Sequence, residues 1–276
     1  MRWRIQGKDH DLSRRAMVMG ILNVTPDSFS DGGRHFDAGA ALKQARRMIV
    51  EGVDIMDVGG ESTRPGADPV DDQAECARVI PVIRALRDEW EGLISIDTMK
   101  SEVARAALDA GADIVNDVSG LRDPAMVSLC AERGCAVVVM HMRGEPRTMQ
   151  ASPEYGDVVA EVRGFFEQRL AELVEAGIDP ECLCFDPGIG FGKTLEHNLE
   201  LLSGVKELHV ADRPLLIGLS RKSFIGRLLE SDRLDDRDWP TVALTAWTRE
   251  SGAMVHRVHE VKPNLEALRM VEAVMG

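Results

Sequence analysis

The sequence predicts a single α/β domain spanning residues 1–276, a (β/α)₈ barrel with a short hairpin or strand at its N-terminus. The length of 276 residues is typical of one α/β barrel. Short apolar runs alternate with amphipathic segments along the chain. Several of these segments end in a glycine that leads directly into the next apolar run, as at Gly52, Gly111 and Gly134. A glycine in the left-handed cap position explains that repeated junction.

The polar opening of the chain, up to about Ser13, is too short for a barrel unit. We expect it to form a hairpin or strand that closes the bottom of the barrel. Hydrophobic residues make up 44% of the chain but aromatic residues only 4%, so the predicted core is mostly aliphatic.

Eight apolar runs are the candidate strands, and each is bounded by turn or helix residues. They are Met17–Val24, Val53–Gly59, Leu93–Thr98, Asp113–Gly120, Ala136–His141, Cys182–Gly188, Pro214–Ser220 and Met254–His259.

The segments between the runs carry apolar residues at helical spacing. Two such sets are Leu42, Ala45, Met48 and Ile49, and Val158, Val162, Phe165, Phe166 and Leu173. Eight strands alternating with helices fit a barrel better than a doubly wound sheet.

Composition and charge exclude several classes of function. The formal charge of −13 argues against binding to nucleic acid or to an anionic membrane. No apolar run approaches the roughly 18 residues of a membrane span, and the N-terminus has no signal-peptide core. The five cysteines match no disulfide or zinc spacing, and buried reduced thiols suit a cytoplasmic protein.

Nearly every predicted strand ends in a polar residue. In a barrel the carboxyl ends of all strands meet at one mouth, where active sites lie. A single polar strand end is usually a helix cap, but a full ring of them predicts an enzyme-type pocket. The residues are Asn23, Asp57, Asp97, Asn116, His141, Asp186, Ser220, Arg257 and His259.

Asp97 and Asp186 follow the third and sixth strands, so they should approach the mouth from nearly opposite sides. Together with Asn116 they suit a flat heterocycle that presents N–H donors along one edge, since one carboxylate can accept two such donors. A divalent-metal site built from the same carboxylates is the less favoured alternative, because the usual accompanying ligands are absent.

Cationic and hydroxyl residues predict an anion site at the same mouth. Ser220, Arg221, Lys222 and Ser223 lie at a strand-to-helix junction, where backbone N–H groups favour an anion. Arg257 and His259 share one face of the last strand. Two turn-rich loops, Asn23–Gly33 and Gly59–Ala67, follow the first two strands. The second loop carries Ser62, Thr63 and Arg64. Together the two loops suggest lids that close over a diphosphate.

The stretch Asp186–Thr194, DPGIGFGKT, nearly matches a nucleotide-binding P-loop. Pro187 stands where that loop needs its first glycine and has no backbone N–H to offer a phosphate. We therefore expect its glycines to turn the chain sharply after Asp186 and to leave Phe191 free to cover the mouth.

The motifs together resemble the dihydropteroate synthase family of the bacterial folate pathway. They are MGILNVTPDSFSDGG, GGESTRPGA, SIDT, NDVSG, MHMRGEPRTMQ, DPGIGFGKTLEHN, SRKSFIG and RVHEV, in the family's order from about Met17 to Val261. Arg143, Glu145 and Glu260 are small departures, and the first two loops have the form of drug-sensitive members. The resemblance implies condensation of 6-hydroxymethyl-7,8-dihydropterin diphosphate with 4-aminobenzoate, giving 7,8-dihydropteroate and diphosphate.

The resemblance also implies roles for individual residues. Asp97, Asn116, Asp186 and Lys222 would hold the pterin, while Thr63, Arg64, Arg257 and His259 would hold the diphosphate. Phe29, Pro65, Phe191 and Ser223 would line the aminobenzoate pocket, and Met140 and Gly218 complete the substrate-binding set. Asn23 would bind Mg²⁺ together with the diphosphate. Asp31 would approach the reacting carbon and joins Lys222, Asp97, Asp186, Arg257 and His259 as catalytic.

Three further expectations accompany this interpretation. Sulfonamides are expected inhibitors, and a homodimer is expected because family members usually form one. The apolar patterns of Thr241–Trp247 and Leu265–Val274 fit either a dimer face or ordinary helix packing. The alternatives are a pterin-dependent methyltransferase domain, which would not need the diphosphate loops, and a non-catalytic pterin-binding paralogue. The intact set Asn23, Thr63, Lys222, Arg257 and His259 argues against both.

Overall fold

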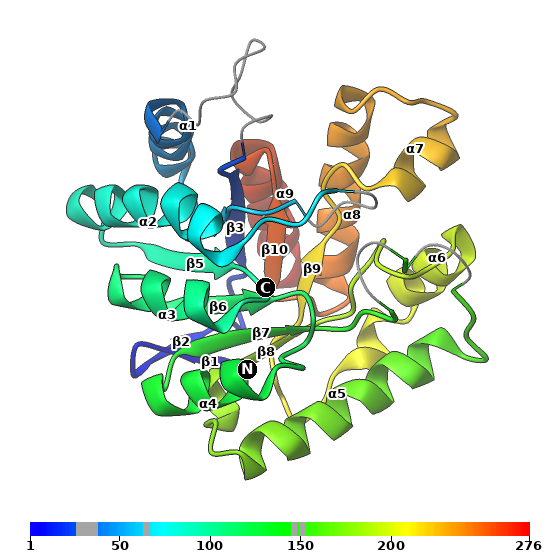
Figure 1. Ribbon diagram of the computed structural model, residues 1–276. Helices are drawn as coiled ribbons and strands as arrows, with labels where there is room; N and C mark the ends of the chain where they lie inside the picture. The colour runs from blue at the N-terminus through cyan, green and yellow to red at the C-terminus, as the bar shows by residue number, and fades with distance from the viewer. Residues whose placement is uncertain (26–37, 63–66, 145–147, 150–152) are drawn as a thin grey trace.

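The structure is a computed structural model, and it describes residues 1–25, 38–62, 67–144, 148–149 and 153–276. Eight parallel strands form the sheet in the order β8-β7-β6-β5-β4-β3-β10-β9 (Figure 1). An isolated parallel bridge between Phe185 and Leu215 joins the two outer strands and closes the barrel. The strands are β3 (Met17–Asn23), β4 (Ile55–Gly59), β5 (Leu93–Asp97), β6 (Ile114–Asp117), β7 (Ala136–Met140), β8 (Leu183–Asp186), β9 (Leu216–Gly218) and β10 (Val255–Val258). All eight predicted strands are confirmed.

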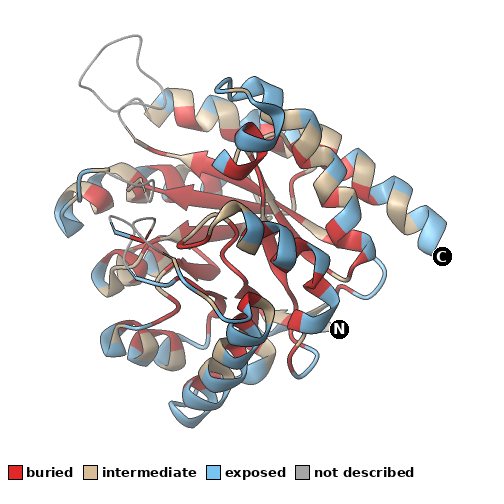
Figure 2. Ribbon diagram, turned by 90° about the vertical axis from the view of Figure 1, so that its right-hand side faces the viewer, coloured by how far each residue is buried: buried red, intermediate tan, exposed pale blue. Residues whose placement is uncertain are grey.

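Helices follow each strand and cover the outside of the barrel, with their outer faces exposed (Figure 2). They are α1 (Ala38–Glu51), α2 (Asp72–Glu89), α3 (Ser101–Asp109), α4 (Pro124–Arg133), α5 (Val158–Glu175), α6 (Leu195–Ser203), α7 (Ser223–Leu229), α8 (Asp238–Glu250) and α9 (Val261–Met275). Short 3₁₀ turns lie at η2 (Pro180–Cys182), η3 (Val205–Leu208) and η4 (Asp235–Arg237). Gly134 ends α4 with a φ of 59°, the left-handed cap that the sequence predicts.

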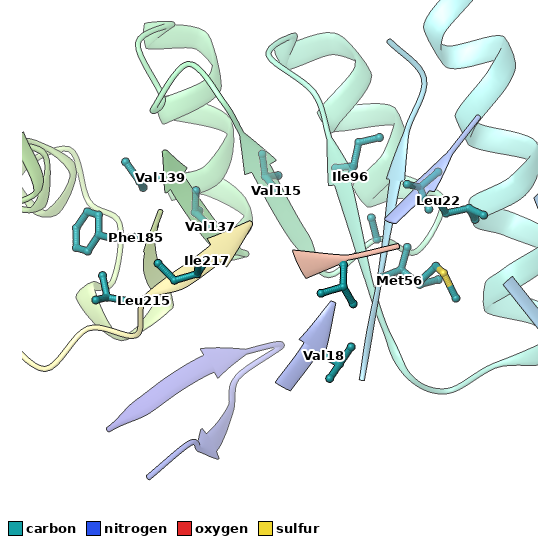
Figure 3. Packing of buried hydrophobic residues seen from close by; sticks show 14 of the residues in the cluster. Val18, Leu22, Met56, Ile96, Val115, Val137, Val139, Phe185, Leu215 and Ile217 are labelled. Carbon is teal, nitrogen blue, oxygen red and sulfur yellow. The ribbon is translucent and has the colours of Figure 1, made fainter. Parts of the chain in front are cut away.

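The core has two layers because strand side chains alternate between the two faces of the sheet. Outward-facing residues such as Val18, Met56, Val115 and Ile217 pack against the helices (Figure 3). Inward-facing residues, among them Met19, Ile55, Val138 and Leu216, fill the barrel interior.

The predicted N-terminal hairpin is confirmed and closes the bottom of the barrel. Strands β1 (Arg2–Ile5) and β2 (Lys8–Asp11) pair antiparallel. Trp3 is fully buried among the inward-facing residues, and its indole N–H donates to the carbonyl of Cys182 at 2.9 Å. With the bottom filled by apolar side chains, the polar strand ends can meet only at the opposite mouth.

Candidate active site

The polar residues at the strand ends, with the exception of His141, share the inward face of the barrel. Asn23, Gly59, Asp97 and Asn116 lie side by side across β3, β4, β5 and β6 in the strand register. Met140 lies beside Asp186, and Gly218 lies beside Arg257. Since these positions have the same parity as the interior apolar residues, their side chains point into the mouth.

Arg257 connects two carboxylates at the centre of this group. Its Nε lies 2.6 Å from Asp57 Oδ2, and one terminal nitrogen lies 2.6 Å from Asp97 Oδ2. Asn116 Nδ2 donates to Asp57 Oδ2 at 3.2 Å. Asp57, which is fully buried, therefore belongs to the site although the sequence identified it only as a strand end. The sequence signal that could have identified Asp57 as a site residue is an aspartate at an inward-facing position of an otherwise apolar strand.

The Asp97 carboxylate has unused capacity to accept hydrogen bonds. Burial raises the pKa of Asp97 to about 7, with Arg257 acting in the opposite direction and Asp57 adding to the rise. Its Oδ1 is buried and has no hydrogen-bond partner among the described residues. A buried acceptor without a donor is costly, so this oxygen is suited to a ligand that brings an N–H group.

Asp186 reaches the mouth from another side, because β6 and β7 separate its strand from that of Asp97. Its Oδ1 accepts the backbone N–H of Gly188 at 2.7 Å. Burial raises the pKa of Asp186, against the effect of that hydrogen bond and of Lys222. A Cβ at Gly218 would lie 4.0 Å from Asp186 Oδ2, so the glycine leaves the carboxylate uncovered.

Lys222 and Phe191 meet above this carboxylate. The Lys222 amine lies 3.9 Å from the centre of the Phe191 ring, within cation–π distance. Lys222 is the N-cap of α7, and Ser223 is the first residue of that helix. A Cβ at Gly190 would lie 3.1 Å from Lys222 Cδ, which shows how closely the glycine-rich loop approaches the lysine.

His259 is oriented by Ser220. The backbone N–H of His259 donates to Ser220 Oγ at 3.1 Å, and the ring Nδ1 lies 2.8 Å from the same oxygen. Between Ser220 and Lys222, Arg221 has a φ of 59° and pairs with Asp238 outside the barrel.

The segment DPGIGFGKT forms a turn rather than a nucleotide site, as the sequence predicts. Gly188 has a φ of 67°, and the chain folds back so sharply that a Cβ there would lie 2.0 Å from the carbonyl oxygen of His141. Lys193, the residue that would contact phosphate in a P-loop, is 3% exposed and lies beneath the turn. Helix α6 begins after Thr194, its N-cap.

His141 does not share the inward parity of its neighbour Met140, and its side chain lies beneath the glycine-rich turn. Its Nδ1 lies 3.1 Å from the Lys193 amine. Burial, together with the charge of Lys193, lowers the pKa of His141 to about 3, which keeps the ring neutral. These contacts give His141 a supporting position instead of a place among the mouth residues.

Five of the predicted site residues lie outside the described residues: Phe29, Asp31, Thr63, Arg64 and Pro65. The roles given to them stay predictions.

The described residues also bear on metal binding and on membranes. No three histidine, cysteine or acidic side chains among them are grouped so as to hold a metal ion, and Asp97 is paired with Arg257 instead. Asn23 is half-buried beside Gly59 at the end of β3 and offers one neutral amide oxygen. That donor set fits Mg²⁺, which commonly takes few protein ligands and completes its shell with phosphate oxygens and water. No helix in the described part of the chain is long and apolar enough to cross a membrane.

Comparisons with known proteins agree with this geometry. The model of the pterin binding enzyme family matches residues 19–259. Dihydropteroate synthase of Escherichia coli K12 is 48% identical over 274 residues, covering 98% of this chain and 95% of that protein. The Mycobacterium leprae enzyme of the same name is 48% identical over 265 residues, covering 93% and 92% of the two chains.

Solved structures give the same result. The dihydropteroate synthase of Yersinia pestis, in complex with a sulfonamide drug, has a TM-score of 0.93 and 44% identity, with 100% of this chain and 99% of that chain covered. The Xanthomonas albilineans enzyme in complex with 7,8-dihydropteroate has a TM-score of 0.90 and 40% identity, with the same coverage. The chain therefore belongs to the dihydropteroate synthase family of pterin-binding enzymes.

Proposed function

We propose that the protein, working as a single domain over residues 1–276, condenses 6-hydroxymethyl-7,8-dihydropterin diphosphate with 4-aminobenzoate to give 7,8-dihydropteroate and diphosphate. The observation that carries the proposal is the inward group of Asp97, Asn116 and Asp186, with Lys222 and Arg257 beside it. Acceptors and cations lie together there, a combination that suits a polar heterocycle bearing an anionic group.

The pterin would bind through its N–H edge to Asp97 and Asp186, with Asn116 and Lys222 completing its hydrogen bonds. The partnerless Oδ1 of Asp97 supports this placement, since an N–H donor would satisfy it. Met140 and Gly218 lie next to Asp186 and Arg257 in the register, where they would contact the ring.

The diphosphate would lie at the cationic side of the mouth. Arg257 and His259 project from the same face of the last strand, and Thr63 and Arg64 of the second loop would add contacts. Asn23 would hold Mg²⁺ together with the diphosphate oxygens, and the metal would supply charge that stabilises the leaving group.

The 4-aminobenzoate would bind between the pterin and the two loops that follow the first two strands. Phe29, Pro65 and Phe191 would line its ring, and its carboxylate would face Ser223 at the start of α7. Sulfonamides, which resemble it in shape and charge, would occupy the same place.

The reaction needs no activated nucleophile. The bond between the pterin methylene carbon and the diphosphate oxygen breaks, and the electron pair leaves with the diphosphate, where Arg257 and His259 balance the new charge. The cation that remains is stabilised by Asp97 and Asp186, with Asp31 approaching the reacting carbon. The amine nitrogen of 4-aminobenzoate then donates its lone pair to that carbon, and the nitrogen releases a proton to complete the product.

Diphosphate release tests the proposal. With Mg²⁺ and pterin diphosphate, wild-type protein should release diphosphate rapidly when 4-aminobenzoate is present, and Lys222→Ala should lower the rate by about 10²-fold or more. Lys206→Ala, an exposed lysine on η3, is the matched control and should behave as wild type. Tight pterin binding with no diphosphate under any condition would instead identify a binding-only paralogue.

Three coarser features complete the proposal. We place the protein in the cytoplasm, which its five free cysteines support. We expect it to act on small molecules and to bind neither nucleic acid nor membranes, in keeping with its charge of −13. We also propose that the protein forms a homodimer.

A further inference from the structure

Lys193 is almost completely buried, yet its amine is surrounded by hydrogen-bond acceptors. Its Nζ lies 3.0 Å from the carbonyl oxygens of Gly188 and Phe191, and 3.4 Å from that of His141. The fourth partner is His141 Nδ1 at 3.1 Å. Three carbonyl oxygens and one imidazole nitrogen therefore share one amine in a site that is 3% exposed.

These acceptors come from two different parts of the barrel mouth. His141 follows β7, whereas Gly188 and Phe191 belong to the turn after β8. Lys193 therefore connects the ends of two neighbouring strands through side-chain bonds, in addition to the backbone bond from His141 N to Asp186 O at 2.8 Å.

The turn is held at other points as well, but none of those contacts reaches the Phe191 carbonyl. Gly190 N donates to Asn198 Oδ1 at 2.7 Å, and the Tyr155 hydroxyl donates to Gly192 O at 2.9 Å. Phe191 N donates to Gly188 O at 3.0 Å. The Lys193 side chain thus donates to the carbonyl oxygens at both ends of the short turn from Gly188 to Phe191.

The ring of Phe191 points the other way, toward the mouth, where Lys222 lies 3.9 Å from its centre. Small shifts of the turn would therefore move the ring and change its contact with Lys222. Lys193 thus bonds to the backbone carbonyl of Phe191, and Lys222 packs against its ring.

We propose that Lys193 is a positioning residue that orders the Phe191 ring for 4-aminobenzoate, an inference that rests on the proposed function. An ammonium group is costly to bury, and an apolar side chain of the same length would fill the space without that cost. The amine has at most three N–H groups to share among these four acceptors, and its bonds to carbonyls of the turn give directional control that an apolar side chain does not provide. Lys193 acts through Phe191 and does not touch the reacting atoms.

Steady-state kinetics distinguish positioning from general stability. In Lys193→Met the side chain keeps its length but loses its donors, and we expect the KM for 4-aminobenzoate to rise about tenfold or more. The KM for pterin diphosphate should rise less than the KM for 4-aminobenzoate, because Asp97 and Asn116 lie on strands away from the turn, although Asp186 accepts the N–H of Gly188 within it. The inhibition constant of a sulfonamide should rise in parallel with the 4-aminobenzoate KM. Lys206→Met, on an exposed lysine, is the control and should match wild type.

A double-mutant cycle tests the route through Phe191. Phe191→Ala alone should raise the 4-aminobenzoate KM, and adding Lys193→Met to it should cause less than about a twofold further rise. Fully multiplicative effects would overturn the proposal, as would a Lys193→Met protein with reduced thermal stability but an unchanged 4-aminobenzoate KM. Where Lys193→Met yields no folded protein, Lys193→Gln, which retains a donor, should fold and show a smaller rise in the same KM.

Failure of the proposed function would give a different result. A wild-type protein that forms no dihydropteroate overturns the synthase proposal. In that case the sulfonamide affinity of Lys193→Met, measured by calorimetry with pterin and diphosphate present, still tests the positioning role of Lys193. An unchanged sulfonamide affinity in Lys193→Met overturns the positioning role.

Discussion

Arg257 is the residue around which the site is organised, because its single positive charge lies between two carboxylates and reduces their mutual repulsion. Asp57 and Asp97 are both within 2.6 Å of its guanidinium group. Burial raises the pKa of Asp97 to about 7 although Arg257 opposes the rise, and one Asp97 oxygen has no donor among the residues that the structure describes. A pterin that needs an ionised Asp97 should therefore bind more tightly as the pH rises through about 7.

Asp57→Asn should move this pH dependence to lower pH. Removing the neighbouring negative charge and leaving Arg257 to pair with Asp97 alone both favour the ionised form, so the pKa of Asp97 should fall. Pterin dissociation constants measured by fluorescence between about pH 5.5 and 8.5, corrected for titration of the free pterin, check this shift. An inflection that stays at the wild-type pH would contradict it.

The raised pKa of Asp97 also makes the free energy of unfolding depend on pH, in the opposite direction to pterin affinity. Because the folded protein holds the Asp97 proton more tightly than the unfolded chain does, this carboxyl stabilises the fold below its unfolded pKa. That contribution is lost as the pH rises through about 7. Pterin affinity should therefore improve over the same range in which this contribution to the free energy of unfolding declines.

Ser220 is a second residue whose substitution should change catalysis measurably, because it acts directly on His259. Its hydroxyl contacts both the backbone N–H and the ring of His259. Ser220→Ala should lower kcat/KM for pterin diphosphate by at least about fivefold to tenfold, because it removes both contacts and a hydrogen bond contributes ~1 kcal/mol. Ser203→Ala, on the exposed end of α6, is a suitable control and should leave kcat/KM unchanged.

At the scale of elements, the N-terminal hairpin contributes to stability at a distance from the chemistry. Trp3→Ala would open a cavity among the inward-facing residues and break the bond to Cys182. We expect a loss of about 3–5 kcal/mol in the free energy of unfolding, measured by urea denaturation. The kinetic constants of the folded protein should stay near wild type, because the mouth lies at the other end of the strands.

Arg2→Ala provides the comparison for this element, since Arg2 occupies an exposed position of the same strand. It should change the free energy of unfolding by less than about 0.5 kcal/mol. Equal losses for the two variants would mean that the hairpin acts through its backbone and not through the Trp3 side chain.

For the whole molecule, we propose that exposed apolar side chains on one side form the contact face for a second copy. They come from α6, α7, the segment after α7, and α8, which lie together in Figure 1. Trp247 is 55% exposed and bonds to the carbonyl of Leu202, which joins α8 to α6. Further exposed members are Leu199, Leu228, Leu229, Leu234 and Trp239. Thr241 and Thr245 are buried, so part of the stretch predicted for a dimer face serves helix packing instead.

Trp247→Glu should convert the proposed homodimer into a monomer, because a charge would be buried in an apolar contact. Sedimentation equilibrium of the wild type and the variant measures this. Val50→Glu on α1, equally apolar and 88% exposed, should remain dimeric. A wild-type protein that is monomeric at micromolar concentration would show the homodimer proposal to be wrong.

The sequence by itself determined the barrel and most of the mouth. Apolar runs with helical segments between them specify the strands, because burial on both faces of a parallel strand requires such runs. The polar residues at the ends of those runs, such as Asp97, Asn116 and Asp186, are confirmed as inward-facing. Pro187 correctly argued against a nucleotide loop, because a missing N–H is a local property of the chain.

Tertiary structure alone decided which of these residues meet. Asp57 and Arg257 are separated by 200 positions, and they touch because the barrel brings β4 and β10 to either side of β3. Lys193 and His141 meet because the turn after β8 folds back over the end of β7. Contacts across neighbouring strands depend on sheet register and closure, and no local spacing in the sequence encodes them.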